Sequence, residues 1–216
     1  MLVPRISAAL AEADSVIAGV SLSAKRHGAR VADEILSQSA HATSSLEKGP
    51  DLGLAVAVID AVATLPSIAI SPMQAIAALH AVVGLSEPVE NRGRPRADFV
   101  ENDRLMALAD VARSTQPALL VGAILHGELL SMSPFGTHNG LIARAVLRGV
   151  LTQRGIEPLI STEIGLGDLG INALALALSE YQKGTADGVA TWVEFNVKAV
   201  EFGAKALMDV INRPAR

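Results

Sequence analysis

Apolar residues recur at helical spacing along most of the chain, and no long stretch alternates strictly between apolar and polar residues. This spacing is typical of amphipathic helices and predicts an all-α fold. We expect helices over residues 4–20, 23–39, 52–65, 73–84, 104–113, 118–132, 140–155, 169–183 and 188–212.

Several helix ends carry local signals. A break rich in serine and threonine is expected over 39–51, and Asp51 is suited to cap the helix that follows it. Another helix is expected to begin at Pro72, which suits a first helical position, and to end at Gly84.

The longest irregular stretch is the polar segment 86–103, "SEPVENRGRPRADFVEND". Loops of this length inside a compact domain are usually functional or disordered. Arg94 and Arg96 within it can bind a phosphate or the acidic surface of a partner, or can be solvated loop charges. The sequence favours the solvated interpretation.

Composition narrows the class of protein. A chain of 216 residues is long enough for one domain with a sizeable core. The formal charge of −4 argues against a nucleic-acid binder, and the absence of cysteine excludes disulfides and thiolate metal sites. The apolar stretch 52–70 is interrupted by Asp60 and Pro66, and 171–179 is too short to span a bilayer. We expect a cytoplasmic protein that does not bind membranes, with a deep helical core and a homodimer interface.

One loop has candidate chemistry, "SPFGTHNGLIAR" over 133–144. The N-terminus of the helix after it presents unpaired N–H groups and a partial positive charge, which suit an anion. Gly136 and Gly140 let the backbone approach a ligand, and Asn139 offers an amide. Arg144, one turn into the helix, can reach the same anion. Phosphate is therefore a reasonable ligand, although a plain turn between helices explains the same residues.

The same loop resembles the Fic (Fido) family, whose signature reads His-Pro-Phe-x-Asp/Glu-Gly-Asn-Gly-Arg-x-x-Arg. Matching positions hold Pro134, Phe135, Asn139, Gly140 and Arg144. The resemblance implies a helical bundle with a central helix-loop-helix and a short flap. By resemblance, the phosphate- or nucleotide-binding positions are Gly136, Thr137, His138, Asn139, Gly140 and Arg144.

Other segments resemble the family in the same order along the chain. His126 and His80 fall on family histidines in the helices before the motif and before the flap. Residues 93–100 resemble the segment from which the flap runs, and 181–200 the closing helix. The resemblance covers roughly 40–205 and implies one Fic-like domain over 1–216. Within it, 1–50 would be N-terminal helices and 51–216 the core.

Three departures bear on activity. Family members typically transfer AMP from ATP and need a base, a metal-binding acid and an arginine, at whose positions this chain has Ser133, Thr137 and Leu141. A serine hydroxyl cannot act as a general base near neutral pH, threonine is a poor ligand for Mg²⁺, and leucine has no charge. We therefore expect a pseudoenzyme without ordinary adenylyltransferase activity (AMPylation).

Other histidines offer alternatives to the lost base. His138 stands where the family has glycine, and can titrate, bind phosphate or face water. It is the substitute base if the chain is a divergent nucleotidyl- or phosphotransferase. His126 lies on an apolar helix and is expected to be a core residue, although it could activate Ser133 as a nucleophile. Trp192 and Phe195 are expected to anchor the last helix.

Glu47 is a candidate regulatory residue. The segment 43–48, "TSSLEK", resembles the family's inhibitory helix, which implies that Glu47 pairs with Arg144 and obstructs a terminal phosphate. Lys48 departs from the glycine or asparagine expected there. Alternatively, Ser44 and Glu47 have the spacing of a capping box at a helix N-terminus.

These observations leave three hypotheses for function. The first is a degenerate Fic-fold protein that retains a loop for a nucleotide or phosphate, with ATP and Mg²⁺ as the cofactors to test and a protein target or partner. The second is the divergent transferase. The third is a helical protein-interaction module without a ligand site. No metal site is expected from the protein's own residues.

Overall fold

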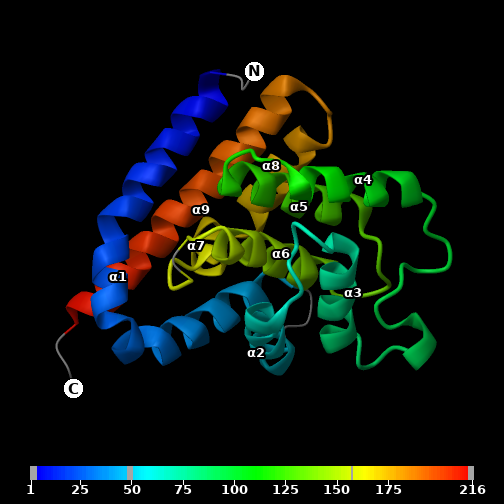
Figure 1. Cartoon of the computed structure of the whole chain (residues 1–216), viewed down its shortest axis with the longest axis horizontal. Coiled ribbons are helices and arrows are strands. Elements are labelled where there is room, and N and C mark those ends of the chain that lie inside the picture. The colour runs from blue at the N-terminus through cyan, green and yellow to red at the C-terminus, as the bar shows by residue number, and fades with distance from the viewer. Residues whose placement is uncertain (1–3, 48–50, 157, 214–216) are drawn as a thin grey trace.

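The chain folds into helices packed around a central pair, as a computed structural model shows (Figure 1). The structure describes residues 4–47, 51–156 and 158–213, and these contain no strand. The all-α prediction is confirmed. The α-helices are α1 Pro4–Ser45, α2 Leu52–Ala61, α3 Pro72–Val83, α4 Asn102–Arg113, α5 Ala118–Met132, α6 Asn139–Gln153, α7 Thr162–Leu169, α8 Ile171–Tyr181 and α9 Ala186–Asn212.

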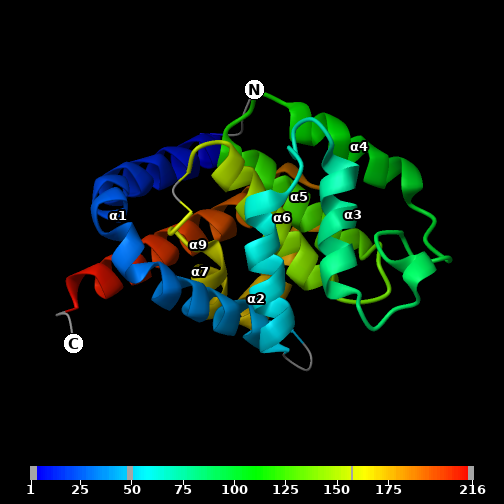
Figure 2. The ribbon, with the colours of Figure 1, turned by 60° about the horizontal axis from the view of Figure 1, so that its bottom comes forward.

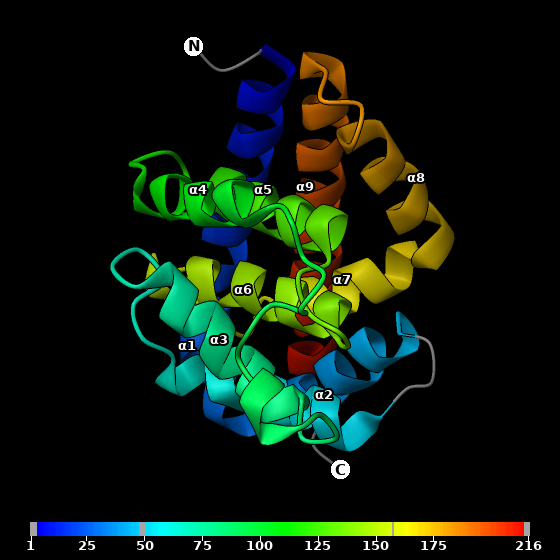
Figure 3. The same cartoon turned by 90° about the vertical axis from the view of Figure 1, so that its right-hand side faces the viewer.

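Helices α5 and α6 form the central pair, and their buried side chains belong to two apolar clusters. One cluster joins them to α1, α7, α8 and α9, and the other joins them to α2, α3 and α4. Figures 2 and 3 show α1 and α9 running side by side on one flank and α2 and α3 on the other. The loop between α5 and α6, which carries the candidate motif, is therefore supported by both clusters.

The N-terminal region differs from the prediction. One helix, α1, replaces the two expected over 4–20 and 23–39, and it continues to Ser45 through the expected break. Instead of ending where the first expected helix ends, α1 bends along its length (Figure 1). Hydroxyls within it donate to carbonyls of the preceding turn, as Ser39 Oγ does to Ile35 O at 2.7 Å. These bonds let polar residues stay inside the helix.

A short helix, α7, was not predicted. It begins where Ser161 Oγ accepts the N–H of Ile164 at 3.2 Å. Its Glu163 is 1% exposed and pairs with Arg148 of α6 at 2.9 Å. The helix expected over 169–183 is shorter in the structure, where α8 begins at Ile171. The predicted anchor of the last helix is confirmed, since Trp192 is fully buried and stacks on Phe195 with ring centroids 5.7 Å apart.

Among the described residues, one helix is long and apolar enough to cross a membrane by length and composition. It is α1, whose best window has a mean hydropathy of 1.3 and is 22% buried. Core helices of soluble proteins meet the same criterion, and α1 packs along α9. The finding therefore assigns no location to the protein.

Candidate functional site

The loop between α5 and α6 begins and ends with a residue in left-handed backbone geometry. Ser133, with φ of 45°, follows α5, and His138, with φ of 58°, precedes α6. A left-handed residue after a helix turns the chain away from the helix axis. The two turns bring the start of α6 back beside the end of α5. Neither residue is glycine, so both carry steric strain.

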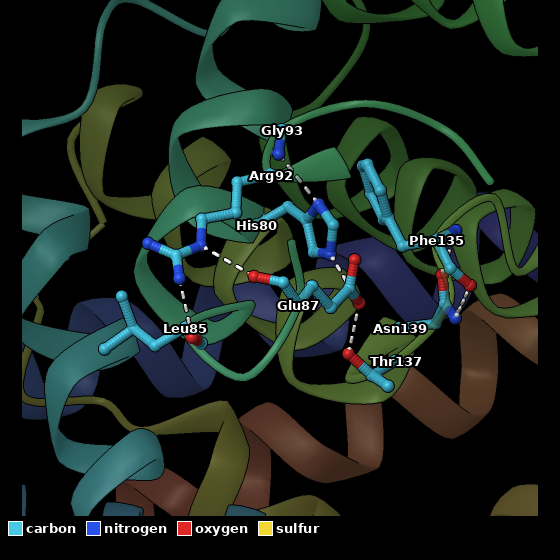
Figure 4. Close-up of polar contacts among 8 residues, drawn as sticks. All are labelled: His80, Leu85, Glu87, Arg92, Gly93, Phe135, Thr137 and Asn139. Carbon is cyan, nitrogen blue, oxygen red and sulfur yellow. Dashed lines mark hydrogen bonds and ion pairs between the residues drawn. The ribbon is translucent and has the colours of Figure 1, made fainter. Parts of the chain in front are cut away.

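Asn139 holds the loop closed. Its Oδ1 accepts the N–H of Phe135 at 2.9 Å, and its Nδ2 donates to the carbonyl of Phe135, also at 2.9 Å. Both functional groups of the amide are therefore used inside the loop (Figure 4). Asn139 shapes the cradle through the backbone, and its role as a direct phosphate ligand stays a prediction.

Phe135 is also held from outside the loop, by a buried histidine. The ring of His80, on α3, stacks on Phe135 with centroids 4.1 Å apart. His80 Nδ1 accepts the N–H of Gly93 at 3.0 Å, which leaves the proton of the neutral ring on Nε2. That proton points to Glu87 Oε1 at 3.3 Å.

Glu87 ties the polar segment after α3 to the candidate loop. Its Oε1 accepts a hydrogen bond from Thr137 Oγ1 at 2.6 Å in addition to the one from His80 (Figure 4). Partial burial alone would raise the pKa of Glu87, but the bonds from Thr137 and His80 outweigh it and hold that pKa below its ordinary value. Glu87 is therefore ionised at neutral pH.

Arg96 makes a second tie between the same two segments. Its backbone N–H donates to Pro134 O at 2.9 Å, and its Nε donates to Ser133 O at 3.2 Å. Arg96 is therefore a partly exposed loop charge that is bonded to the candidate loop, and it also pairs with Asp98. Arg94 is exposed, as expected for a solvated loop charge.

Arg144 lies below the loop and is 2% exposed. Its Nε donates to Thr43 Oγ1 at 2.5 Å, and its NH2 group donates to Thr43 O at 3.1 Å and to Glu47. Burial lowers the pKa of Arg144, while Glu47 acts in the opposite direction. The pairing of Glu47 with Arg144 that the family resemblance implied is present.

The alternative explanation of Glu47 is wrong. Ser44 lies inside α1 near its C-terminal end, and Glu47 N–H donates to Ser44 O at 3.1 Å. A capping box stands at a helix N-terminus, so these residues do not form one. Lys48, the departure from the family's inhibitory segment, lies outside the described residues. Whether Glu47 inhibits a ligand stays a prediction.

A cavity of about 610 Å³ opens between the loop, the end of α1 and α8. No described side chain caps the N-terminus of α6, which faces this cavity. The loop residues and charged side chains that line the cavity are Glu47, Gly136, Thr137, His138, Asn139, Gly140 and Arg144. The structure thus brings together all the residues that the sequence proposed for a phosphate, and Glu47 with them.

His126 stands apart from the loop. It is fully buried, packs on Trp192 and shares a hydrogen bond of 3.0 Å with Asn196 Oδ1 through Nδ1. Burial lowers its pKa to about 3, the bond to Asn196 opposes this shift, and the charge of Arg144 adds to it. His126 is therefore a neutral core residue, as expected, and it is not placed to activate Ser133, whose Oγ donates to Leu130 O at 3.1 Å.

The side chains at the three positions that depart from the signature are bonded within the chain or buried. Ser133 Oγ is turned to its own helix, Thr137 Oγ1 donates to Glu87, and Leu141 is buried in the core. The described residues contain no group of three or more side chains suited to a metal ion. The donor set therefore fits Mg²⁺ poorly, whereas the helix N-terminus and Arg144 fit an anion.

Two partners in the site were missed from the sequence. Thr43 binds Arg144 from 101 positions away, and Glu87 binds Thr137 from 50 positions away. Glu87 lies in the polar segment 86–103, whose length was the available signal. Its specific partner depends on how that segment crosses the loop.

Comparison with known proteins supports the fold. A crystal structure of a Fic family protein from Desulfovibrio desulfuricans G20 superposes with a TM-score of 0.77, at 18% sequence identity, over 100% of this chain and 77% of that one. No protein-family model and no curated protein matches the sequence. The chain therefore has a Fic-like fold. Identity this low defines the fold alone.

Proposed function

We propose that this protein binds a phosphate-bearing ligand, with ATP as the first compound to test, beside the loop 133–140, and that it does not perform ordinary AMP transfer. One observation carries the proposal. The uncapped N-terminus of α6 and the guanidinium of Arg144 line the same cavity of about 610 Å³. Cavities of this size are common for small ligands, and both groups attract anions.

The contacts of Glu47 support a site that is held back until the carboxylate moves. Its carboxylate occupies Arg144 and lies over Gly140, where an added Cβ would overlap it. A bound phosphate would meet this negative charge at close range. The end of α1 would therefore weaken binding of the ligand, and displacing Glu47 would strengthen it.

The absence of transfer rests on the side chains rather than on the fold. A general base typically contributes about 10²–10⁴-fold to such a reaction, and Ser133 cannot supply it. His138 lines the cavity, so a divergent transferase that uses it as the base is the second candidate. A third candidate, a protein-interaction module, would leave the cavity without a ligand.

Calorimetric titration tests the proposal. ATP, with and without Mg²⁺, is added to the wild type, to Glu47→Gly and to Arg144→Lys, which keeps the charge but not the planar fork. We expect binding that is roughly tenfold tighter in Glu47→Gly and is weakened in Arg144→Lys. If neither ATP nor pyrophosphate binds Glu47→Gly, the site does not bind phosphates. Transfer of labelled nucleotide that His138→Gln abolishes would establish the divergent transferase instead.

A further inference from the structure

The cavity beside the candidate loop is lined by two chemically different groups of residues. The polar group consists of Arg144, Glu47 and the start of α6. The aliphatic wall is made of side chains from α8, α5 and the turn after α1. They are Leu46, Leu130, Ile171, Leu174, Ala175 and Leu178.

The aliphatic wall has few means of recognising polar groups. None of its described side chains has a hydrogen-bonding atom, and from Leu174 onward the backbone N–H groups of α8 are used inside the helix, the first of them bonding Gly170 O at 3.1 Å. Reading the edge of a nucleobase requires donors and acceptors at fixed positions. A base placed on this wall would lose water and gain no partner there.

Apolar surface on the wall is also left open to water. Ile171 is 51% exposed at the rim of the cavity. Covering such surface with a hydrocarbon group is favourable, by about fourfold in affinity for each CH2 group buried. The polar group lines the same cavity as the aliphatic wall, so one ligand can contact both, with its anionic head at the polar group.

We infer that the ligand is a phosphorylated hydrocarbon, with its phosphate or diphosphate head at the start of α6 and a flexible aliphatic body along α8. This inference rests on the proposed function, since it assumes a phosphate at that loop, and it specifies what the phosphate is attached to. Nucleobase identity would then contribute little to binding.

A series of probes separates the contribution of the head from that of the body. Methyl, butyl and octyl phosphate, inorganic triphosphate and ATP are titrated into the wild type and into Glu47→Gly. Octyl phosphate should bind roughly tenfold or more tightly than methyl phosphate, with butyl phosphate between them. ATP should gain less than about threefold over inorganic triphosphate, because its base finds no hydrogen-bonding partner.

Two variants of α8 locate the effect. Ile171→Ser should reduce the ratio of octyl to methyl phosphate affinity by roughly threefold or more. The matched control is Leu176→Ser, because Leu176 is on the same helix and 68% exposed but does not line the cavity. It should leave the ratio unchanged, and methyl phosphate should bind both variants like the wild type.

The outcomes separate this inference from the proposed function. Phosphates that bind with no dependence on chain length, or ATP that binds roughly tenfold or more tightly than triphosphate, would overturn the inference and keep the phosphate site. If no probe binds even Glu47→Gly, both fail. Co-sedimentation with vesicles that contain phosphatidic acid distinguishes the source: binding of vesicles assigns a membrane lipid, and binding of the soluble probes alone assigns a water-soluble ligand.

Discussion

Glu47 at the end of α1 and Arg144 in the first turns of α6 form an ion pair across 97 positions of sequence. The arginine is 2% exposed, and Thr43, one helical turn before Glu47, also accepts hydrogen bonds from it. The end of α1 therefore supplies the polar environment that allows a guanidinium to be buried beside the cavity. Substitutions at the end of α1 should therefore change the position or the hydrogen bonds of Arg144.

The first prediction concerns the stability that depends on this pair. Arg144→Met should lower the free energy of unfolding by roughly 3 kcal/mol, because it leaves Glu47 and the acceptors of Thr43 without their donor. The control is Arg113→Met, since Arg113 and its partner Asp110 are exposed, and it should cost less than about 0.5 kcal/mol. Urea unfolding measures both, and equal effects would contradict the role of the buried pair.

A second prediction concerns acid and His126. Its pKa is about 3 in the folded protein, compared with about 6.5 for an unfolded histidine. The unfolded chain therefore takes up this proton first as the pH falls. The stability that depends on neutral His126 is complete above pH about 6.5 and is lost below it, at up to about 1.4 kcal/mol per pH unit.

Urea unfolding of the wild type and His126→Leu between pH 7.5 and 5 tests this slope. His126→Leu should be less stable at pH 7.5, because Asn196 Oδ1 loses its hydrogen bond to His126, but its stability should fall less steeply with acid. His27 is exposed, so His27→Ala should keep the wild-type slope. A slope that survives in His126→Leu would assign the acid sensitivity elsewhere.

A third prediction concerns Glu87, whose pKa is lowered in the folded protein. Its stabilising bonds are therefore present above the unfolded value of about 4.3 and are lost as the pH falls through the folded value. Glu87→Gln should be about 1–2 kcal/mol less stable than the wild type at pH 7, and the difference should shrink at pH 3. Glu90→Gln, at an exposed residue of the same segment, should differ little from the wild type at either pH.

A fourth prediction uses the strained backbone at Ser133. With φ of 45°, this position favours glycine, so Ser133→Gly should raise the free energy of unfolding by up to about 1 kcal/mol and the Tm by about 2–4 °C. Ser133→Ala keeps the strain and loses the bond to Leu130 O, so it should be no more stable than the wild type. Thermal unfolding of the two variants compares them, and a less stable Ser133→Gly would show that the hydroxyl outweighs the strain.

Helical periodicity predicted most elements of this fold, and the errors have local causes. Serine and threonine are poor helix formers in isolation, which is why 39–51 resembled a break. Gly165 and Gly167 made α7 resemble a loop, but they let this helix approach its neighbours. A Cβ at Gly165 would overlap the backbone of Ala199, and one at Gly167 would lie 2.9 Å from Ala42 Cβ.

The site was predictable in part. The motif at 133–144 and its resemblance indicated the loop, its helix and the pairing of Arg144 with Glu47. The bond between Glu87 and Thr137 was not predictable, because it depends on the path of an irregular segment whose conformation no periodicity encodes. Hydrogen bonds between distant loops require the fold before they can be assigned.

The last prediction measures how closely Glu47 covers the start of α6. Gly140 lies in the first turn of that helix, and a Cβ added there would overlap the carboxylate of Glu47. Gly140→Ala should therefore destabilise the wild type by roughly 1–3 kcal/mol, because Glu47 must withdraw from Arg144 to make room. In Glu47→Gly the same substitution should be neutral or stabilising by up to about 1 kcal/mol, because alanine favours the helix.

A double-mutant cycle with urea unfolding gives the coupling between the two positions, and we expect at least about 1 kcal/mol. Gly155→Ala serves as a control for glycine replacement in general. It has φ of 89°, so it should be destabilising, but by the same amount with and without Glu47. Additive effects of Gly140→Ala and Glu47→Gly would mean that the carboxylate does not press on the helix start. In that case it would not stand where a ligand's phosphate must bind.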